Sequence, residues 1–238
     1  MITNNDYLLL KEKYPNNMDE IMDKINNNYP VQYLIGYVNF YGYKINVNES
    51  VLIPRFETEL LTKKTIDYIN KYNIKPNIID ICTGSGCIAV MLSKELNSHV
   101  DALDISSDAI KVAKTNAKEN NSDITFINED IKLFNTNKKY NVLISNPPYV
   151  SYDEEVDIKT KYEPDIALYA NDSGIEFYKI ILNKSKDILE KNNIIAFEIG
   201  YTQGNIIKDL AQEIYPNAII TIEKDLDNKD RYVFIINA

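Results

Sequence analysis

From Pro76 onward, short apolar segments typical of β-strands alternate with longer segments in which apolar residues recur at helical spacing. The predicted strands cover residues 77–82, 99–105, 123–128, 140–145, 192–200, 217–224 and 231–237, and the predicted helices cover 86–96, 107–120, 174–191 and 203–214. Such alternation predicts an α/β fold with a mostly parallel sheet and helices on both faces. The last two strands are joined by a short acidic turn, and a parallel crossover needs about a dozen residues. We therefore expect an antiparallel hairpin to close the sheet.

The first 56 residues precede this pattern and differ from it. Residues 1–30 are polar and weakly helical, so we expect a short helical lead without a core of its own. Residues 31–56 are rich in Tyr, Val and Ile around a Tyr41-Gly42 turn, which predicts a β-hairpin linker. Apolar residues then follow helical spacing from Glu57 to Lys71. The expected organisation is a lead over 1–30, a linker over 31–56 and one main domain over 57–238.

Composition excludes several classes of protein. The formal net charge is −9, from 35 acidic and 26 basic residues, which argues against direct nucleic-acid binding because phosphate contacts draw on clustered Lys and Arg. No apolar run approaches the ~18 residues that a membrane span needs, and the N-terminus resembles neither a signal nor a transit peptide. Two cysteines and one histidine predict neither a zinc or other metal site nor a disulfide framework. The expected location is a reducing cytoplasm.

A glycine-containing turn follows the first strand of the repeating pattern. The segment "DICTGSGCIA", residues 80–89, passes from strand to helix through Gly84 and Gly86. Asp104 ends the next predicted strand, where a carboxylate can accept hydrogen bonds from ribose hydroxyls. This arrangement predicts nucleoside binding, and its spacing also fits the loose dinucleotide fingerprint of NAD-binding proteins. Asp80 would repel a pyrophosphate but attract a cation, which favours S-adenosylmethionine over NAD.

Two further strand ends carry candidate binding residues. Asp130 and the apolar Ile131 follow the third strand, where they could hydrogen-bond an adenine amino group and cover its ring. The fourth strand ends in "NPPY", residues 146–149. The two prolines lack an N–H and have a fixed φ, so this turn is stiff. It presents the Asn146 amide, free carbonyls and an aromatic ring at the carboxyl edge of the sheet, where ligands of open α/β sheets bind.

The chain resembles the class I methyltransferases, and within them the PrmC/HemK family of release factor glutamine methyltransferases, from about Pro30 to its end. The motifs that carry this resemblance are "PVQYLIG" (30–36), "FYG" (40–42), "VLIPRFETELL" (51–61), "DICTGSGCIA" (80–89), "NPPY" (146–149), "YEPDIAL" (162–168), "FEIG" (197–200) and "DNKDR" (227–231). It implies a Rossmann-like domain over 57–238 with a seven-stranded sheet. It also implies S-adenosylmethionine as cofactor and methyl transfer to a glutamine side chain of peptide chain release factors.

The resemblance assigns candidate residues to two parts of one site. The cofactor-binding candidates are Asp80, Cys82, Thr83, Gly84, Ser85, Gly86, Asp104, Ile105, Asp130, Ile131 and Asn146. The substrate-binding candidates are Arg55, Glu57, Thr58, Asn146, Pro147, Pro148 and Tyr149, of which Asn146, Pro147 and Tyr149 are the catalytic candidates. The Asn146 side-chain oxygen and the Pro147 carbonyl would accept the two N–H groups of the substrate amide, and Tyr149 would pack against it. Arg55, Glu57 and Thr58 would close one wall, although Thr58 could equally just begin a helix.

The sequence departs from the family pattern at three places. Cys82 stands where the family has the first glycine of the loop, Phe56 replaces a usual proline, and the lead of about thirty residues is shorter than the family's helical domain. Other functions also remain open. They are methylation of another protein glutamine, such as one in a ribosomal protein, methylation of an exocyclic base amine, NAD-dependent dehydrogenation, and binding without catalysis.

Overall fold

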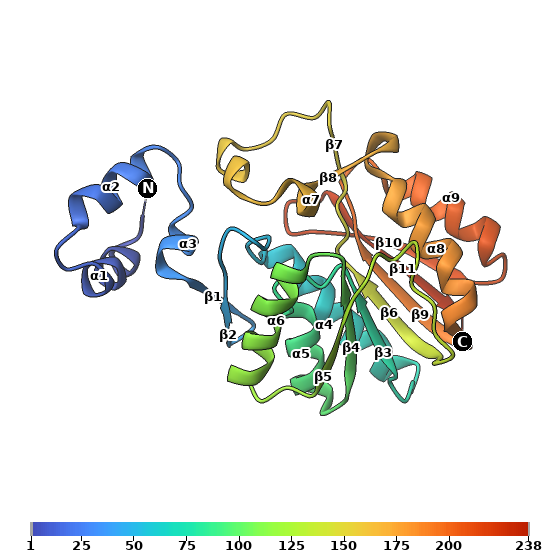
Figure 1. The fold of residues 1–238 in the computed structure, drawn as a ribbon. Helices are drawn as coiled ribbons and strands as arrows, with labels where there is room; N and C mark the ends of the chain where they lie inside the picture. Colours follow the sequence, from blue (N-terminus) through green and yellow to red (C-terminus); the bar gives the residue numbers. More distant parts are fainter. Residues whose placement is uncertain (1, 238) are drawn as a thin grey trace.

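The computed structural model describes residues 2–237, and a seven-stranded sheet organises them (Figure 1). The sheet has the strand order β10-β11-β9-β6-β3-β4-β5. Its strands are β3 (Ile78–Ile81), β4 (Val100–Asp104), β5 (Ile124–Asn128), β6 (Tyr140–Ser145), β9 (Leu189–Glu198), β10 (Ile219–Lys224) and β11 (Asp230–Asn237). The strands β5, β4, β3, β6 and β9 are parallel, and β11 pairs antiparallel with both β9 and β10. The predicted fold class and the antiparallel closing hairpin are confirmed.

Helices cover both faces of this sheet because each central strand is apolar on both sides. Ile78 packs into one apolar cluster with α4 and α5, whereas its neighbour Ile79 packs into the other with α8 and α9. The helices are α4 (Phe56–Lys71), α5 (Cys87–Leu96), α6 (Ser107–Glu119), α8 (Glu176–Ile188) and α9 (Gly204–Ile214). With helices on both faces of the sheet, the main domain has three layers. Strand β9 begins at Leu189, three residues before the predicted start at residue 192.

The elements before α4 lie at one side of the sheet, where β2 (Tyr43–Asn46) packs against α5 and α6 (Figure 1). They are α1 (Asn4–Lys13), α2 (Met18–Asn26), α3 (Val31–Ile35), β1 (Tyr37–Phe40) and β2. The predicted hairpin is present, with β1 and β2 antiparallel around the turn at 41–42.

One expectation for this part was wrong, because the lead does contain packed apolar residues: Leu10 and Ile21 are buried with Leu34 of the linker in a small cluster apart from the main core. The hairpin follows a helix at Val31–Ile35 that was not predicted from the sequence. Lys13 Nζ donates to the carbonyls of Leu34 and Ile35 at 3.0 and 2.8 Å, so a tertiary contact satisfies the end of this helix.

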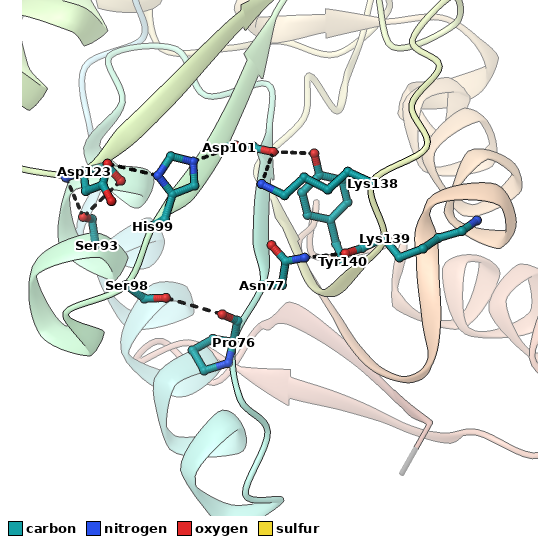
Figure 2. A network of polar contacts seen from close by, with 10 residues as sticks. All are labelled: Pro76, Asn77, Ser93, Ser98, His99, Asp101, Asp123, Lys138, Lys139 and Tyr140. Carbon is teal, nitrogen blue, oxygen red and sulfur yellow. Dashed lines mark hydrogen bonds and ion pairs between the residues drawn. The ribbon is translucent and has the colours of Figure 1, made fainter.

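A polar network ties three strands together at the amino edge of the sheet (Figure 2). Asp101 of β4 accepts hydrogen bonds from Lys138 Nζ at 2.7 Å and from the Tyr140 hydroxyl at 2.5 Å. Its other oxygen lies 2.9 Å from His99 Nε2, and His99 Nδ1 lies 3.0 Å from Asp123. His99 therefore has a structural role far from the carboxyl edge where ligands bind.

Between β6 and α8 the chain forms a long excursion over the carboxyl edge of the sheet (Figure 1). It contains β7 (Val150–Ser151), η1 (Ile158–Tyr162), α7 (Asp165–Leu168), β8 (Tyr169–Ala170) and η2 (Asp172–Gly174). Strands β7 and β8 form a small parallel pair. This excursion places α7 close to the ends of the central strands.

Candidate active site

The loop between β3 and α5 is held in left-handed backbone conformations. Cys82, Gly84 and Gly86 have φ of 61°, 54° and 80°. A Cβ at Gly86 would lie 3.0 Å from the Cβ of Ala113, so glycine lets this helix start approach α6 closely. At Cys82 the chain adopts a conformation that a residue with a side chain rarely takes. Glycine at this position in the family pattern thus has a clear physical reason.

Asp104 joins this loop to the end of β4. Its carboxylate accepts hydrogen bonds from the backbone N–H of Gly84 at 2.8 Å and of Ser106 at 2.9 Å. Burial raises the pKa of Asp104, while these backbone hydrogen bonds oppose the shift. Each carboxylate oxygen can accept a second hydrogen bond, so both remain able to bind a ligand.

Asp80 lies beneath the loop and is fully buried. Its Oδ2 accepts a hydrogen bond of 2.5 Å from the Thr83 hydroxyl, whereas Oδ1 has no partner within hydrogen-bond distance among residues 2–237. Burial raises the pKa of Asp80 to about 7. The backbone N–H of Ala89 is close enough to the carboxylate to oppose this rise of its pKa. An unpartnered buried carboxylate oxygen is costly, and a cationic group nearby would offset that cost.

A cavity opens above the loop at the carboxyl ends of the strands. It is lined by residues from the predicted set, namely Thr58, Cys82, Thr83, Gly84, Ser85, Asp104, Ile105, Asp130, Ile131, Asn146 and Pro148. The remaining wall comes from Ser50, Val51, Leu52, Pro54, Cys87, Ile88, Leu103, Ser106, Ala109, Lys132, Pro164, Ile166, Ala167 and Phe177. The structure thus brings the candidates from four strand ends into one cavity.

At the third strand end, Asp130 and Ile131 face this cavity together. Asp130 Oδ1 accepts from the backbone N–H of Lys132 at 2.9 Å, which fixes its side chain in a tight turn. Ile131 is almost fully buried, and Phe177 lines the same region. The cavity therefore has an apolar lining beside one acceptor, an arrangement suited to a flat heteroaromatic ring.

Asn146 follows directly after β6, and its amide is held by α4. Its Nδ2 donates to the Thr58 hydroxyl oxygen at 3.1 Å, and that hydroxyl donates to Glu198 Oε2 at 2.7 Å. Among residues 2–237, no hydrogen bond reaches Asn146 Oδ1. The side-chain oxygen is thus left to accept a hydrogen bond from a group in the cavity.

Pro147 and Tyr149 of the same turn do not line the cavity. Pro147 is buried, and the Tyr149 ring packs against the apolar cluster beneath α8 and α9. The Tyr149 hydroxyl lies 3.5 Å from Glu198 Oε1, at the limit of a hydrogen bond. The expected stacking of Tyr149 on a substrate amide and the expected contact of the Pro147 carbonyl with that amide therefore remain predictions that the cavity lining does not support.

Arg55, Glu57 and Thr58 were expected to close one wall of the site. Of these three residues, only Thr58 lines the cavity. Arg55 forms an ion pair with the buried Glu163, whose other oxygen accepts from Ile53 N–H at 2.9 Å. This pair fastens the segment before α4 to the excursion that carries α7. Glu57 lines no part of the cavity.

Two groups of residues at this site were not predicted from the sequence. They are the cavity-lining residues of the excursion and the side chains that hydrogen-bond to the turn at Asn146. Ile166, Ala167 and Phe177 line the cavity, and the first two belong to the quoted "YEPDIAL" motif, to which no role was assigned. Glu198 stands at the end of β9 within the apolar run "IIAFEIG". An acidic residue inside a buried strand indicates that other polar groups lie near it, because a buried carboxylate has to be paired or hydrogen-bonded.

Among residues 2–237, no helix is both long and apolar enough to cross a membrane. The same part of the chain holds no group of three or more His, Cys, Asp or Glu side chains arranged to bind a metal ion.

Known bacterial proteins are similar to this chain over most of its length. The methyltransferase small domain family matches residues 57–162. The release factor glutamine methyltransferase of Bacillus cereus is 37% identical over 233 residues, which cover 94% of this chain and 82% of that protein. The enzyme of the same name from Lactococcus lactis is 36% identical and covers 92% of this chain and 81% of its own length.

Solved structures share the fold at low sequence identity. A methyltransferase from Pyrococcus furiosus superimposes with a TM-score of 0.61 at 17% identity, covering 83% of this chain and 90% of that one. Human methyltransferase 10 domain containing protein gives a TM-score of 0.58 at 17% identity, with the same coverage.

The seven-stranded sheet with its closing hairpin is the fold of class I methyltransferases, and the match to the methyltransferase small domain family assigns the chain to that class. Within that class, the chain belongs to the release factor glutamine methyltransferase family.

Proposed function

We propose that this protein transfers a methyl group from S-adenosylmethionine to the side-chain amide nitrogen of a glutamine in a peptide chain release factor. The observation that supports this proposal most directly is the orientation of the Asn146 side chain. Its Nδ2 donates to the Thr58 hydroxyl, so Oδ1 is left to accept a hydrogen bond from a substrate in the cavity. The names of the relatives, which match over most of their length, supply the substrate.

The cavity residues fit the proposed methyl donor. The Asp104 carboxylate would accept from the ribose hydroxyls, and Ile105, Asp130 and Ile131 would surround the adenine ring. The unpartnered Oδ1 of Asp80 suits the cationic methionine end better than it suits the pyrophosphate of NAD, although Asp80 lies beneath the lining. One solved methyltransferase of this fold is complexed with SAH, which is consistent with this assignment.

S-adenosylmethionine supplies an electrophilic methyl group on a sulfonium. The chain's own residues would act on the acceptor. An amide nitrogen is a poor nucleophile because its lone pair is delocalised into the carbonyl. If Asn146 Oδ1 accepts one of its N–H groups and the Pro147 carbonyl, which lies outside the cavity lining in this structure, accepts the other, negative potential gathers at the nitrogen and pyramidalisation becomes easier.

Most of the rate acceleration would come from positioning. Holding reacting groups about 3 Å apart in the correct direction lowers a barrier by several kcal/mol. As positive charge develops on the amide nitrogen, the fixed dipoles of Asn146 and Pro147 stabilise it. No general base is needed before attack, because the product amide can lose its proton to water afterwards.

The test is transfer of a tritiated methyl group to a purified release factor, with tRNA, rRNA and DNA as parallel acceptors. We expect label on the release factor alone, mapped by mass spectrometry to a glutamine and lost when that glutamine is replaced by asparagine. Label on a nucleic acid would instead establish a base-amine methyltransferase. Label on neither the factor nor a nucleic acid would contradict the proposed substrate.

A further inference from the structure

Three buried or half-buried side chains from three separate parts of the chain form a row of hydrogen bonds that leads from the cavity wall into the core. Asn146 Nδ2 lies 3.1 Å from Thr58 Oγ1, and Thr58 Oγ1 lies 2.7 Å from Glu198 Oε2. Thr58 and Glu198 are 3% and 2% exposed, so water does not compete for these contacts. Asn146 alone of the three was proposed above to touch the substrate amide.

The donors and acceptors available fix the direction of this row of hydrogen bonds. An ionised carboxylate can only accept, and a threonine hydroxyl has a single proton to donate. With Glu198 ionised, the Thr58 proton goes to Glu198, and the Thr58 oxygen must accept from Asn146. The Asn146 amide then turns its NH₂ toward Thr58 and leaves Oδ1 for the cavity.

If Glu198 is not ionised, the hydrogen bonds no longer fix the orientation of the Asn146 amide. A protonated Glu198 can donate to Thr58 Oγ1, which frees the Thr58 proton for Asn146 Oδ1. The amide could then rotate by half a turn and present NH₂ to the substrate. Two N–H groups cannot hydrogen-bond each other, so the acceptor on which the proposed chemistry depends would be missing.

The surroundings of Glu198 carry charges of both signs. Arg231 of β11 and Arg55 beside α4 favour its ionised form, whereas Glu57 of α4 opposes it. The hydroxyl of Tyr149 is near one carboxylate oxygen, and the Tyr178 hydroxyl donates to the Glu198 carbonyl at 2.8 Å. Cys87 and Tyr232 are further titratable groups that interact with Glu198. Burial is the largest influence and raises the pKa of Glu198 to about 7.

We propose that Glu198 is a positioning residue which, through Thr58, holds the Asn146 amide with its oxygen toward the substrate. This inference rests on the proposed glutamine methylation, because it assigns Asn146 Oδ1 the task of accepting an amide N–H. In this proposal the Glu198 carboxylate influences catalysis through Thr58 and Asn146, and it contacts neither the methyl donor nor the glutamine.

The test measures single-turnover methyl transfer to the release factor at saturating donor and acceptor, from pH 5.5 to 8.5. For the wild type we expect the rate to rise with pH and level off above an apparent pKa near 7. Glu198→Gln can offer Thr58 either a donor or an acceptor, so its rate should fall by about tenfold or more at pH 8 and lose this rise. Thr58→Val should behave in the same way, because it removes the hydroxyl with little change in shape.

Two variants separate positioning from packing. Thr58→Ser keeps the hydroxyl and should restore the pH-dependent rise together with most of the rate lost in Thr58→Val. Thr65→Val is the matched control, since Thr65 is also buried on α4 but its hydroxyl donates only to the Leu61 carbonyl at 2.8 Å. Thr65→Val should change stability without changing the pH profile. Donor affinity should stay within threefold of wild type in Glu198→Gln and Thr58→Val.

The outcomes distinguish this inference from the proposed function. If Thr58→Val keeps both the wild-type rate and the rise near pH 7 while Asn146→Ala is inactive, Glu198 does not position Asn146, and glutamine methylation stands. If the rise persists in Glu198→Gln, it belongs to another group, and the inference is wrong. If the wild type methylates no release factor, the proposed function fails first.

Discussion

The side-chain amide of Gln203 donates a hydrogen bond of 2.9 Å to the backbone carbonyl of Tyr149, which lies 54 positions earlier in the chain. The two prolines before Tyr149 cannot donate to a neighbouring strand, so the turn depends on contacts of this kind. Gln203 also accepts from the Gly200 N–H at 2.9 Å, which fixes its own side chain. The turn that carries Asn146 is thus held from the start of α9.

Gly174 packs against the same carbonyl, and we predict that Gly174→Ala damages both stability and activity. A Cβ there would lie 2.1 Å from Tyr149 O. Gly42→Ala is the control, because Gly42 has a similar φ of 89° with nothing within 4 Å. Gly174→Ala should cost ~2 kcal/mol more than the control in urea unfolding, as overpacking does. It should also slow methyl transfer by more than about tenfold, as displaced catalytic groups do. Equal effects of the two variants would show that the turn tolerates displacement.

Asp104→Ala should weaken binding of S-adenosylmethionine by more than about tenfold, since a hydrogen bond to a charged group contributes ~1.5–3 kcal/mol. The variant would also release the Gly84 N–H that Asp104 holds. Isothermal titration measures the affinity. Asp108→Ala, at an exposed residue on the first turn of α6, is the control and should bind normally. Wild-type affinity in Asp104→Ala would remove Asp104 from the donor site.

Cys82→Gly should leave donor affinity within about threefold of wild type. The left-handed φ of 61° costs a residue with a side chain ~1–2 kcal/mol, whereas glycine adds ~0.5–1 kcal/mol of unfolded-state entropy. These effects nearly cancel, so the free energy of unfolding should change by less than ~1 kcal/mol. Titration and urea unfolding measure the two quantities. A large change in affinity would mean that the thiol contacts the ligand.

Local patterns were sufficient to predict the strands, most helices and the glycine loop. Hydrophobic period and turn residues depend on near neighbours, so Ile78–Ile81, Gly86 and the stiff turn at Asn146 could be placed from the chain itself. The helix at Val31–Ile35 was missed because its β-branched and aromatic residues favour strands locally. Contacts from Lys13 override that preference.

The supports of the site were beyond local prediction. Thr58 and Glu198 are 140 positions apart, and Gly174 meets Tyr149 only after the excursion has folded back. Nothing in the period of α4 distinguishes Thr58 from Thr62, which donates to a helix carbonyl instead. The residues that touch ligands follow from motifs, whereas the residues that orient them follow from packing.

Asp101→Asn should lower stability at neutral pH and make acid unfolding less steep. Burial alone would raise the pKa of Asp101, but hydrogen bonds from Lys138, Tyr140 and His99 outweigh it and lower the pKa below its ordinary value. The stabilisation is therefore present above the unfolded-state pKa of 3.8 and is lost as pH falls through the lower folded-state value.

Urea unfolding at pH 7 and at pH 3 tests this prediction. The penalty of Asp101→Asn relative to wild type should be large at pH 7 and smaller at pH 3. Asp67→Asn is the control, because Asp67 pairs with Lys63 on the exposed face of α4 and should have little effect at either pH. The same penalty at both pH values would exclude a role for the Asp101 charge.

Asn146→Ala divides catalysis from binding, because it removes the proposed acceptor while the glycine loop and Asp104 remain intact. Loss of one fixed dipole aimed at developing charge costs about 10²–10³ in rate at comparable sites. Methyl transfer should fall by that factor in single turnovers at saturating donor, with donor affinity changed only a few-fold. Asn146→Asp keeps an acceptor but places a charge near the sulfonium, so it should retain partial activity and bind the donor more tightly. The Thr58 contact makes the alanine result specific, since the variant leaves Thr58 bonded to Glu198 and the core behind the cavity unchanged. If the alanine variant turns over within threefold of wild type, Asn146 does not carry the chemistry, and the mechanism proposed for glutamine methylation is wrong.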